Sequence, residues 1–148
     1  MEKDELIYQF HDTGLLTTAM THSSYANEHR DQHIQNNERL EFLGDSILGL
    51  VSADYVFHRY PHVPEGQLTK LRAAVVCEQT LYEVAKELGL DHLLRLGRGE
   101  ENGGGRKRPS ILADSVEALI GAIYLDGGLE AARTFIPVSY THLTLPTI

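Results

Sequence analysis

Hydrophobic residues recur every three to four positions along this chain, and no stretch alternates polar and β-branched residues as a half-buried strand would. The recurrence is strongest where it continues for several turns between clear breakers. It predicts helices over residues 3–10, 15–25, 38–58, 67–76, 78–88, 111–125 and 129–136. We therefore expect an all-α fold.

The predicted helix over residues 38–58 carries its acids on one side. Glu38, Glu41 and Asp45 stand at i, i+3 and i+7, which places them within about 60° of one another on a helix. The opposite side is apolar, and no lysine or arginine is interleaved on the acidic side. A face of a single sign costs free energy unless a cation sits there, so this face is typical of half a metal site.

A second acidic pair lies on the predicted helix over residues 111–125. Asp114 and Glu117 are three residues apart and share one side, with apolar residues behind them. Glycine inside a helix costs about 1 kcal/mol relative to alanine. Gly49 and Gly121, one in each helix, therefore predict a close approach of the two helices, which would bring four carboxylates together.

Four unpaired carboxylates in one cleft repel each other, and a divalent cation relieves that repulsion. Oxygen ligands suit Mg²⁺ or Mn²⁺, and metal-assisted phosphodiester hydrolysis is the chemistry that such a site favours. The alternative is that both acidic faces are simply solvated.

Charge and composition narrow the function classes. The 148 residues suffice for one domain, and the net charge of −8 argues against binding nucleic acid through a broad basic surface. The apolar runs are too short for a membrane span, and the N-terminus is acidic where a signal peptide would be basic. The single cysteine, Cys77, is compatible with a reducing cytoplasm, and its apolar neighbours predict a core position.

The glycine-rich segment over residues 97–109 ends in a basic tip formed by Arg106, Lys107 and Arg108. It lacks the ending of a P-loop. Two interpretations stay open, a flexible solvated loop and a local patch that contacts RNA phosphate groups.

Four sequence blocks carry a resemblance to a known family. NERLEFLGDSILGL begins at residue 37, THSSYANE covers 21–28, PEGQLTKLRA covers 64–73, and LADSVEALIGAIYLDGG covers 112–128. In type and order these blocks resemble the endonuclease domain of bacterial-type ribonuclease III. The resemblance implies a helical domain that forms a homodimer and cuts double-stranded RNA with Mg²⁺, for which Mn²⁺ substitutes. It also implies 5′-phosphate and 3′-hydroxyl ends with two-nucleotide 3′ overhangs, in rRNA and mRNA processing.

The resemblance assigns roles to individual acids. Glu41, Asp114 and Glu117 match the metal ligands, and Asp45 matches the acid that completes the site. Asp45 and Glu117 are the residues expected to act in catalysis.

Three further residues match the family pattern. Glu38 and Glu65 match additional acids of the cleft, and Phe42 matches an apolar residue that plugs into the other subunit. On a helical wheel Phe42 borders the acidic face rather than the core, which fits an interface position.

The ending PVSYTHLTLPTI, residues 137–148, differs from the rest because it has no charged residue and three threonines. It resembles the in-frame translation of a sequencing-library adapter, so we assign the domain to residues 1–136 and treat the tail as a fusion scar. A native tail is the alternative. The family usually adds a double-stranded-RNA-binding domain, whose loss would account for the acidic balance and would weaken RNA binding.

Three rival functions remain. A non-catalytic RNA-binding member of the same fold would be expected to lack one of the four acids, and a compact enzyme without the RNA-binding domain would have an ordered native end. A di-metal redox bundle needs Glu-x-x-His motifs beside its carboxylates, and none accompanies these.

Overall fold

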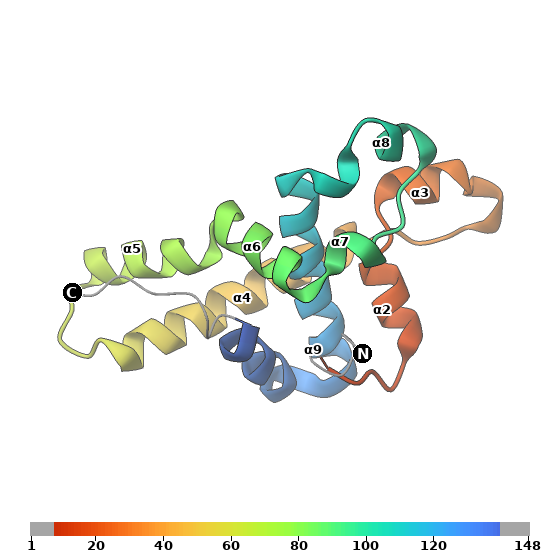
Figure 1. Ribbon diagram of the computed structural model, residues 1–148. Coiled ribbons are helices and arrows are strands. Elements are labelled where there is room, and N and C mark those ends of the chain that lie inside the picture. The colour runs from red at the N-terminus through yellow and green to blue at the C-terminus, as the bar shows by residue number, and fades with distance from the viewer. Residues whose placement is uncertain (1–7, 140–148) are drawn as a thin grey trace.

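The computed structural model describes residues 8–139, and these residues form helices joined by short connections (Figure 1). The helices are α2 (Thr13–Ala19), α3 (Ser23–Glu28), α4 (Glu38–Arg59), α5 (Glu65–Val76), α6 (Glu78–Leu88), α7 (Leu90–Leu93), α8 (Arg98–Asn102) and α9 (Pro109–Ser139), with 3-10 turns η1 (Arg30–Gln32) and η2 (Gly105–Lys107). Within residues 8–139 the only strand-like pairing is one isolated bridge between Thr21 and Arg95. The predicted all-α fold is confirmed.

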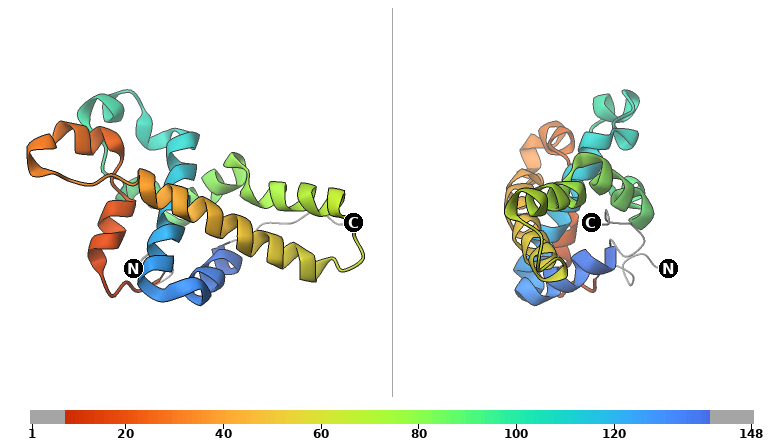
Figure 2. Two further views of the ribbon diagram at one scale, coloured as in Figure 1. Left: turned by 180° about the vertical axis from the view of Figure 1, so that it is seen from behind. Right: turned by 90° about the vertical axis from the view of Figure 1, so that its left-hand side faces the viewer.

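Two long helices, α4 and α9, cross near the middle of the molecule (Figures 1 and 2). Helices α2 and α6 pack against α9, so α9 is covered on several sides. This explains why its apolar residues surround the helix instead of forming one stripe. The largest fully buried side chains are Leu48, Leu90, Leu112, Leu119, Ile120 and Ile123.

The crossing depends on Gly44 and Gly121. A Cβ atom on Gly44 would lie 2.6 Å from the carbonyl carbon of Glu117, and one on Gly121 would lie 3.2 Å from that of Leu40. Real Cβ atoms need more room than the first of these distances, so the two backbones touch directly. The predicted close approach is correct for Gly121 and wrong for Gly49, where an added Cβ atom would meet no other atom within 4 Å.

The second half of α4 extends away from the crossing and pairs with α5, forming an arm on one side of the molecule (Figure 2). The two helices are antiparallel because Pro61 and Pro64 lie in the short connection between them. Leu71 and Val75 of α5 are buried, whereas most of its other residues are exposed or half-buried.

Several boundaries differ from the sequence prediction. The segment over residues 15–25 forms two helices, because the bridge at Thr21 interrupts it. Helix α9 begins at Pro109, two residues before the predicted start at residue 111, and proline is tolerated there since the first helical N–H has no partner. Gly128, with φ 87° and ψ 178°, kinks α9 where the prediction divides it into two helices.

Cys77 does not lie in the core. It is exposed at the junction between α5 and α6, and its Sγ atom lies 3.3 Å from the Thr80 Oγ1 atom. The core prediction is wrong because α5 ends at Val76, so that Cys77 lies between two helices and not on the buried face of one.

The predicted helix over residues 3–10 falls mostly outside the described residues, and residues 8–10 are not helical. Of the predicted tail, residues 137–139 continue α9 and residues 140–148 lie outside the described part. None of the helices within residues 8–139 is both long and apolar enough to cross a membrane.

Candidate metal centre

Three carboxylates meet beside the crossing of α4 and α9. Glu41 comes from α4, and Asp114 and Glu117 come from α9; one oxygen of each lies within 4.8 Å of the others. The glycine contact holds the two backbones so close that acids about one turn from it reach each other. All three side chains are half-buried. The sequence predicts this grouping from helical spacing together with a close approach of the two helices, although it places that approach at Gly49 instead of Gly44.

The carboxyl groups in this cluster resist ionisation. Burial raises the pKa of Glu41 to about 7, and the charge of Asp114 acts in the same direction. Burial also raises the pKa of Glu117 to about 8, with a hydrogen bond to Asp45 as the next cause. The pKa of Asp114 is raised by burial as well, although its hydrogen bond with Glu41 opposes the shift.

The other predicted acids take different places. Asp45 lies beside Glu117 and shares the hydrogen bond described above, so it adjoins the cluster. Glu38, exposed in the first turn of α4, is near enough for its charge to raise the pKa of Glu41. Glu65 is not part of this group, because it begins α5 at the far end of the arm.

The donor set fits a divalent cation. The cluster offers only carboxylate oxygens, the ligands that Mg²⁺ and Mn²⁺ prefer. Raised pKa values mean that these groups need either protons or a cation to coexist, and a cation satisfies all three at once. Di-metal redox bundles also use Glu-x-x-His pairs, and the cluster contains no histidine.

An apolar stripe follows the outer face of α4. Phe42, Gly49, Leu50, Ala53 and Phe57 lie within about 100° of one another on the helix, and we call them the outer stripe. Phe42 is 78% exposed, Phe57 63% and Leu50 55%. Large side chains in a row and open to water are typical of an interaction surface.

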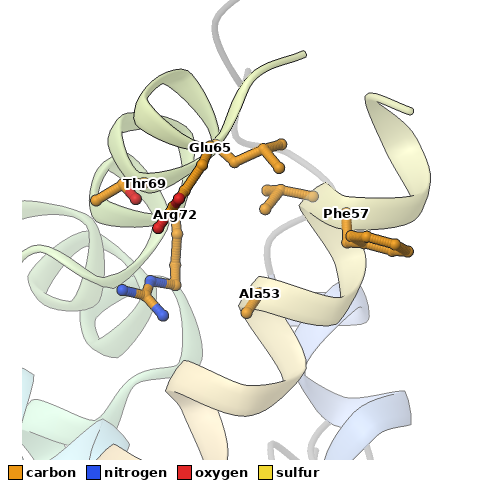
Figure 3. A pocket seen from close by; sticks show the side chains of 7 residues that line it. Ala53, Phe57, Glu65, Thr69 and Arg72 are labelled. Atoms are coloured by element: carbon orange, nitrogen blue, oxygen red, sulfur yellow. The ribbon is translucent and has the colours of Figure 1, made fainter. Parts of the chain in front are cut away.

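A groove lies between α4 and α5 beside the end of the outer stripe (Figure 3). Ala53 and Phe57 of α4 line one side, and Glu65, Thr69 and Arg72 of α5 line the other. Glu65 therefore faces this groove and not the three-carboxylate cluster.

The glycine-rich segment is a small folded unit rather than a loop, because it forms α8 and η2. Arg106 donates from Nη1 to the carbonyl oxygens of Asp91 and Leu94, each at 2.8 Å, and from Nε to Glu101 at 3.0 Å. Arg108 pairs with Glu100. Two of the three basic residues thus hold the segment together, while Lys107 is exposed.

His11, His29 and His33 are not among the residues of the cluster. The main-chain N–H groups of His11 and Asp12 donate to Asp126, so this pair anchors the N-terminal segment. His29 and His33 are four residues apart but do not share a helix, because η1 covers only the residues between them and His33 has a left-handed backbone with φ 52°.

The sequence analysis does not predict two charged residues that affect Asp114. The charge of Glu78, at the start of α6, raises the Asp114 pKa, and the charge of His22 lowers it, both being weaker causes than burial. His22 belongs to the block THSSYANE, whose role the sequence alone does not reveal. The one sequence feature that could have pointed to His22 is that this block matches the family although no function was assigned to it.

Proteins of one family resemble this chain over most of its length. A family model described as Ribonuclease-III-like matches residues 12–142. The chain is 52% identical over 129 residues to Ribonuclease 3 of Listeria monocytogenes, covering 87% of the chain and 56% of that protein. It is 54% identical over 134 residues to Ribonuclease 3 of Bacillus licheniformis, covering 90% and 54%. The chain thus spans about half the length of the curated relatives it matches.

The backbone agrees with a solved structure. The nuclease domain of ribonuclease III from Campylobacter jejuni superposes with a TM-score of 0.87 at 42% identity, covering 95% of each chain. The resemblance inferred from four sequence blocks is therefore confirmed by sequence and by backbone. The chain belongs to the ribonuclease-III-like family.

Proposed function

We propose that this chain is the catalytic domain of a metal-dependent endonuclease that hydrolyses phosphodiester bonds in double-stranded RNA. The observation that carries the proposal is the meeting of Glu41, Asp114 and Glu117 in a chain of this family. Hydrolysis of a phosphodiester needs charge neutralisation at the phosphate, and a cation held by three carboxylates provides it.

In this proposal Glu41, Asp114 and Glu117 hold Mg²⁺, with Mn²⁺ as a substitute. When bound, the cation supplies Lewis acidity toward a phosphate oxygen and lowers the pKa of a water molecule. Asp45 lies close enough to Glu117 to share a proton with it in the absence of the cation, and with the cation bound it adds negative charge beside that ligand. Asp45 and Glu117 are thus the residues that we assign to catalysis. Glu38 adds negative charge at the edge of the site.

The proposed active form is a homodimer in which each subunit cuts one strand. The outer stripe supports this, because Phe42 is 78% exposed beside the acidic cluster. The solved Campylobacter jejuni nuclease domain is described as having a region involved in dimer formation. Two sites acting on opposite strands would leave 5′-phosphate and 3′-hydroxyl ends with two-nucleotide 3′ overhangs. Structured rRNA and mRNA precursors are the proposed substrates.

Contacts to RNA are proposed for the basic tip. Lys107 is the member free to meet a phosphate group directly, whereas Arg106 and Arg108 would have to share their guanidinium groups with the partners described above. Glu65 is retained as a further acid of the cleft, reached through the dimer rather than within one chain. The reducing cytoplasm is the proposed location, on the basis of the single cysteine.

The test is cleavage of a long RNA duplex in Mg²⁺ by the chain and by its Glu117→Ala variant. Loss of a ligand to the cation should lower the cleavage rate at least about a hundredfold. Glu130→Ala is the matched control, since Glu130 lies on the same helix and its side chain is 83% exposed. Equal activity of Glu117→Ala and the unmodified chain would refute the catalytic assignment. RNA products with blunt ends would refute the proposed two-nucleotide 3′ overhangs.

A further inference from the structure

A buried asparagine precedes the helix that carries Glu41. Asn37 lies directly before α4 and is 4% exposed, although asparagine side chains are mostly exposed in proteins. The side chain of Asn37 makes no capping bond to α4. Its neighbour Asn36 supplies the capping oxygen instead, because the Asn36 Oδ1 atom accepts the N–H of Glu38 at 2.9 Å. Helix capping therefore does not explain why an asparagine is buried at this position.

The amide group of Asn37 is turned toward another helix. Its Nδ2 atom donates to the carbonyl oxygen of Ala19 at 3.0 Å. Ala19 is the last residue of α2 and is buried, and the carbonyl groups at a helix end have no partner within the helix. The bond from Asn37 thus satisfies a buried acceptor, and removing the donor would leave that acceptor unpaired.

The main chain of Asn37 bonds to the same segment. Its N–H donates to the carbonyl oxygen of Thr21 at 2.9 Å, so Asn37 contacts the end of α2 both through its side chain and through its backbone. That segment is itself held in place, because the N–H of Arg95 donates to the carbonyl oxygen of Met20 at 2.7 Å and Thr21 is buried. Asn37 is therefore bound to a fixed part of the fold.

Glu41 lies between two fixed points of α4. The carbonyl oxygen of Asn37 accepts the N–H of Glu41 at 2.9 Å, so the first fixed point is one helical turn before this acid. Three residues after Glu41, Gly44 touches the backbone of α9. A single crossing point fixes the distance between two helices but leaves α4 able to turn about it. The bonds of Asn37 supply a second point, and the two together set the direction of the Glu41 carboxylate toward the acids of α9.

We propose that Asn37 is a positioning residue for Glu41. Its bonds to the end of α2 hold the first turn of α4 in the orientation in which Glu41, Asp114 and Glu117 share one cation. In this role Asn37 touches neither the cation nor the RNA. The proposal rests on the proposed function, because it needs a cation at the three-carboxylate cluster. Residues that orient a metal ligand without touching the metal typically account for about a 10- to 100-fold difference in metal affinity.

Substitutions at the two neighbouring asparagines separate this role from helix capping. Asn37→Ser keeps a residue type that is favoured before a helix, but its side chain ends one atom short of the amide nitrogen, so the bond to Ala19 is lost. Asn36→Ala removes the capping oxygen and leaves both bonds of Asn37 to the end of α2 in place. Asn37→Gln keeps an amide donor on a side chain that is longer by one methylene group.

Calorimetric titration of the metal-free chain with Mn²⁺ measures this role without catalysis. We expect Asn37→Ser to lower the Mn²⁺ affinity about tenfold or more. Asn36→Ala should change the affinity less than about threefold, although it lowers the thermal midpoint. Asn37→Gln should keep more of the affinity than Asn37→Ser does. Unchanged affinity in Asn37→Ser, or affinities that simply follow the thermal midpoints of the three variants, would overturn the proposal.

The Mg²⁺ dependence of duplex RNA cleavage tests whether Asn37 acts through the cation. A misdirected ligand weakens cation binding, so kcat of Asn37→Ser should return to within about threefold of that of the unmodified chain at saturating Mg²⁺. A larger loss of kcat that persists at saturating Mg²⁺ would overturn the proposal, because it would mean that Asn37 affects the reaction by another route.

The variant Glu117→Ala separates this proposal from the proposed function. If the unmodified chain and Glu117→Ala bound Mn²⁺ equally, the proposed metal site would be removed and the role of Asn37 with it. If Glu117→Ala abolished Mn²⁺ binding and Asn37→Ser left it unchanged, only the role of Asn37 would be removed.

Discussion

The two faces of α4 differ in what covers them, and one glycine on each face shows the contrast. On the inner face Gly44 touches the main chain of α9 so closely that no Cβ fits. On the outer face Gly49 has open space around it and lies between the exposed side chains of Phe42 and Phe57. One helix thus serves as a rigid support for the carboxylate cluster and as an uncovered apolar surface.

The two faces of α4 differ in whether a single chain covers them. The inner face is complete within one chain, because backbone contact and buried leucines leave nothing for a partner to add. The outer face is incomplete, because the exposed aromatic rings gain free energy only when something covers them. A second copy of the chain is the partner that we propose.

The largest expected effect is that of Gly44→Ala. The added methyl group would have to displace the carbonyl group of Glu117, which belongs to main chain and cannot turn aside. Overpacking against backbone should lower the free energy of unfolding by about 3 kcal/mol or more. Urea denaturation followed by circular dichroism measures this change.

Gly49→Ala is the matched control on the same helix. Because its site is open and helical, alanine should raise the free energy of unfolding by about 0.5 to 1 kcal/mol. A loss on Gly49→Ala as large as that on Gly44→Ala would mean that both faces are equally covered, and the contrast would disappear.

The second effect concerns the outer face alone. Phe42→Asp should weaken dimerisation by about 2 kcal/mol or more, because it removes a large apolar anchor and adds a charge. The same change should leave the fold of the single chain nearly as stable as before, since Phe42 is 78% exposed. Sedimentation velocity at several concentrations measures the association.

Leu125→Asp controls for a general effect of adding charge, because Leu125 is also exposed but lies on α9, outside the outer stripe. Its dimerisation should match that of the unmodified chain. A monomeric unmodified chain at micromolar concentration would contradict the dimer.

The smallest effect is a pH dependence that belongs to the inner face. Folding raises the pKa of Glu41 to about 7 and of Glu117 to about 8, so the folded state binds more protons than the unfolded state does. The free energy of unfolding should therefore fall as pH rises from about 4.5 to about 8 in the absence of divalent cations. Thermal midpoints at about pH 5.5 and pH 8 measure the slope.

Two changes should flatten that slope. Glu117→Gln removes the group with the larger shift, and Mg²⁺ replaces the protons of the cluster, so it should stabilise the chain more at pH 8 than at pH 5.5. A slope that is the same in Glu117→Gln would show that these carboxyl groups do not cause it.

The sequence predicts the carboxylate cluster because helical spacing decides which residues share a face. Asp114 and Glu117 are grouped by spacing alone, and Glu41 joins them because its helix has a single acidic side. Spacing does not say which face meets which neighbour. For that reason the pattern predicts the contact at Gly49, on the open face, whereas the structure has it at Gly44.

Other features depend on contacts between distant segments. Arg106 is held by the carbonyl oxygens of Asp91 in α7 and of Leu94 just after it, which no local pattern reveals. His22 is recognisable as a neighbour of Asp114 only once the fold brings α3 toward the start of α9. Four ordered blocks identify the family, but they cannot supply these distances.

The anchor at Asp126 has a consequence for the chain as a whole. Its carboxylate accepts the N–H groups of His11 and Asp12 and the hydroxyl group of Tyr8, and these bonds join positions about 115 residues apart. Such a bond closes most of the chain into a ring, as a disulfide would in a chain with more than one cysteine. The bonds from His11 and its neighbours hold the pKa of Asp126 at about 2, so mild acid would protonate the carboxylate cluster long before it opened this ring.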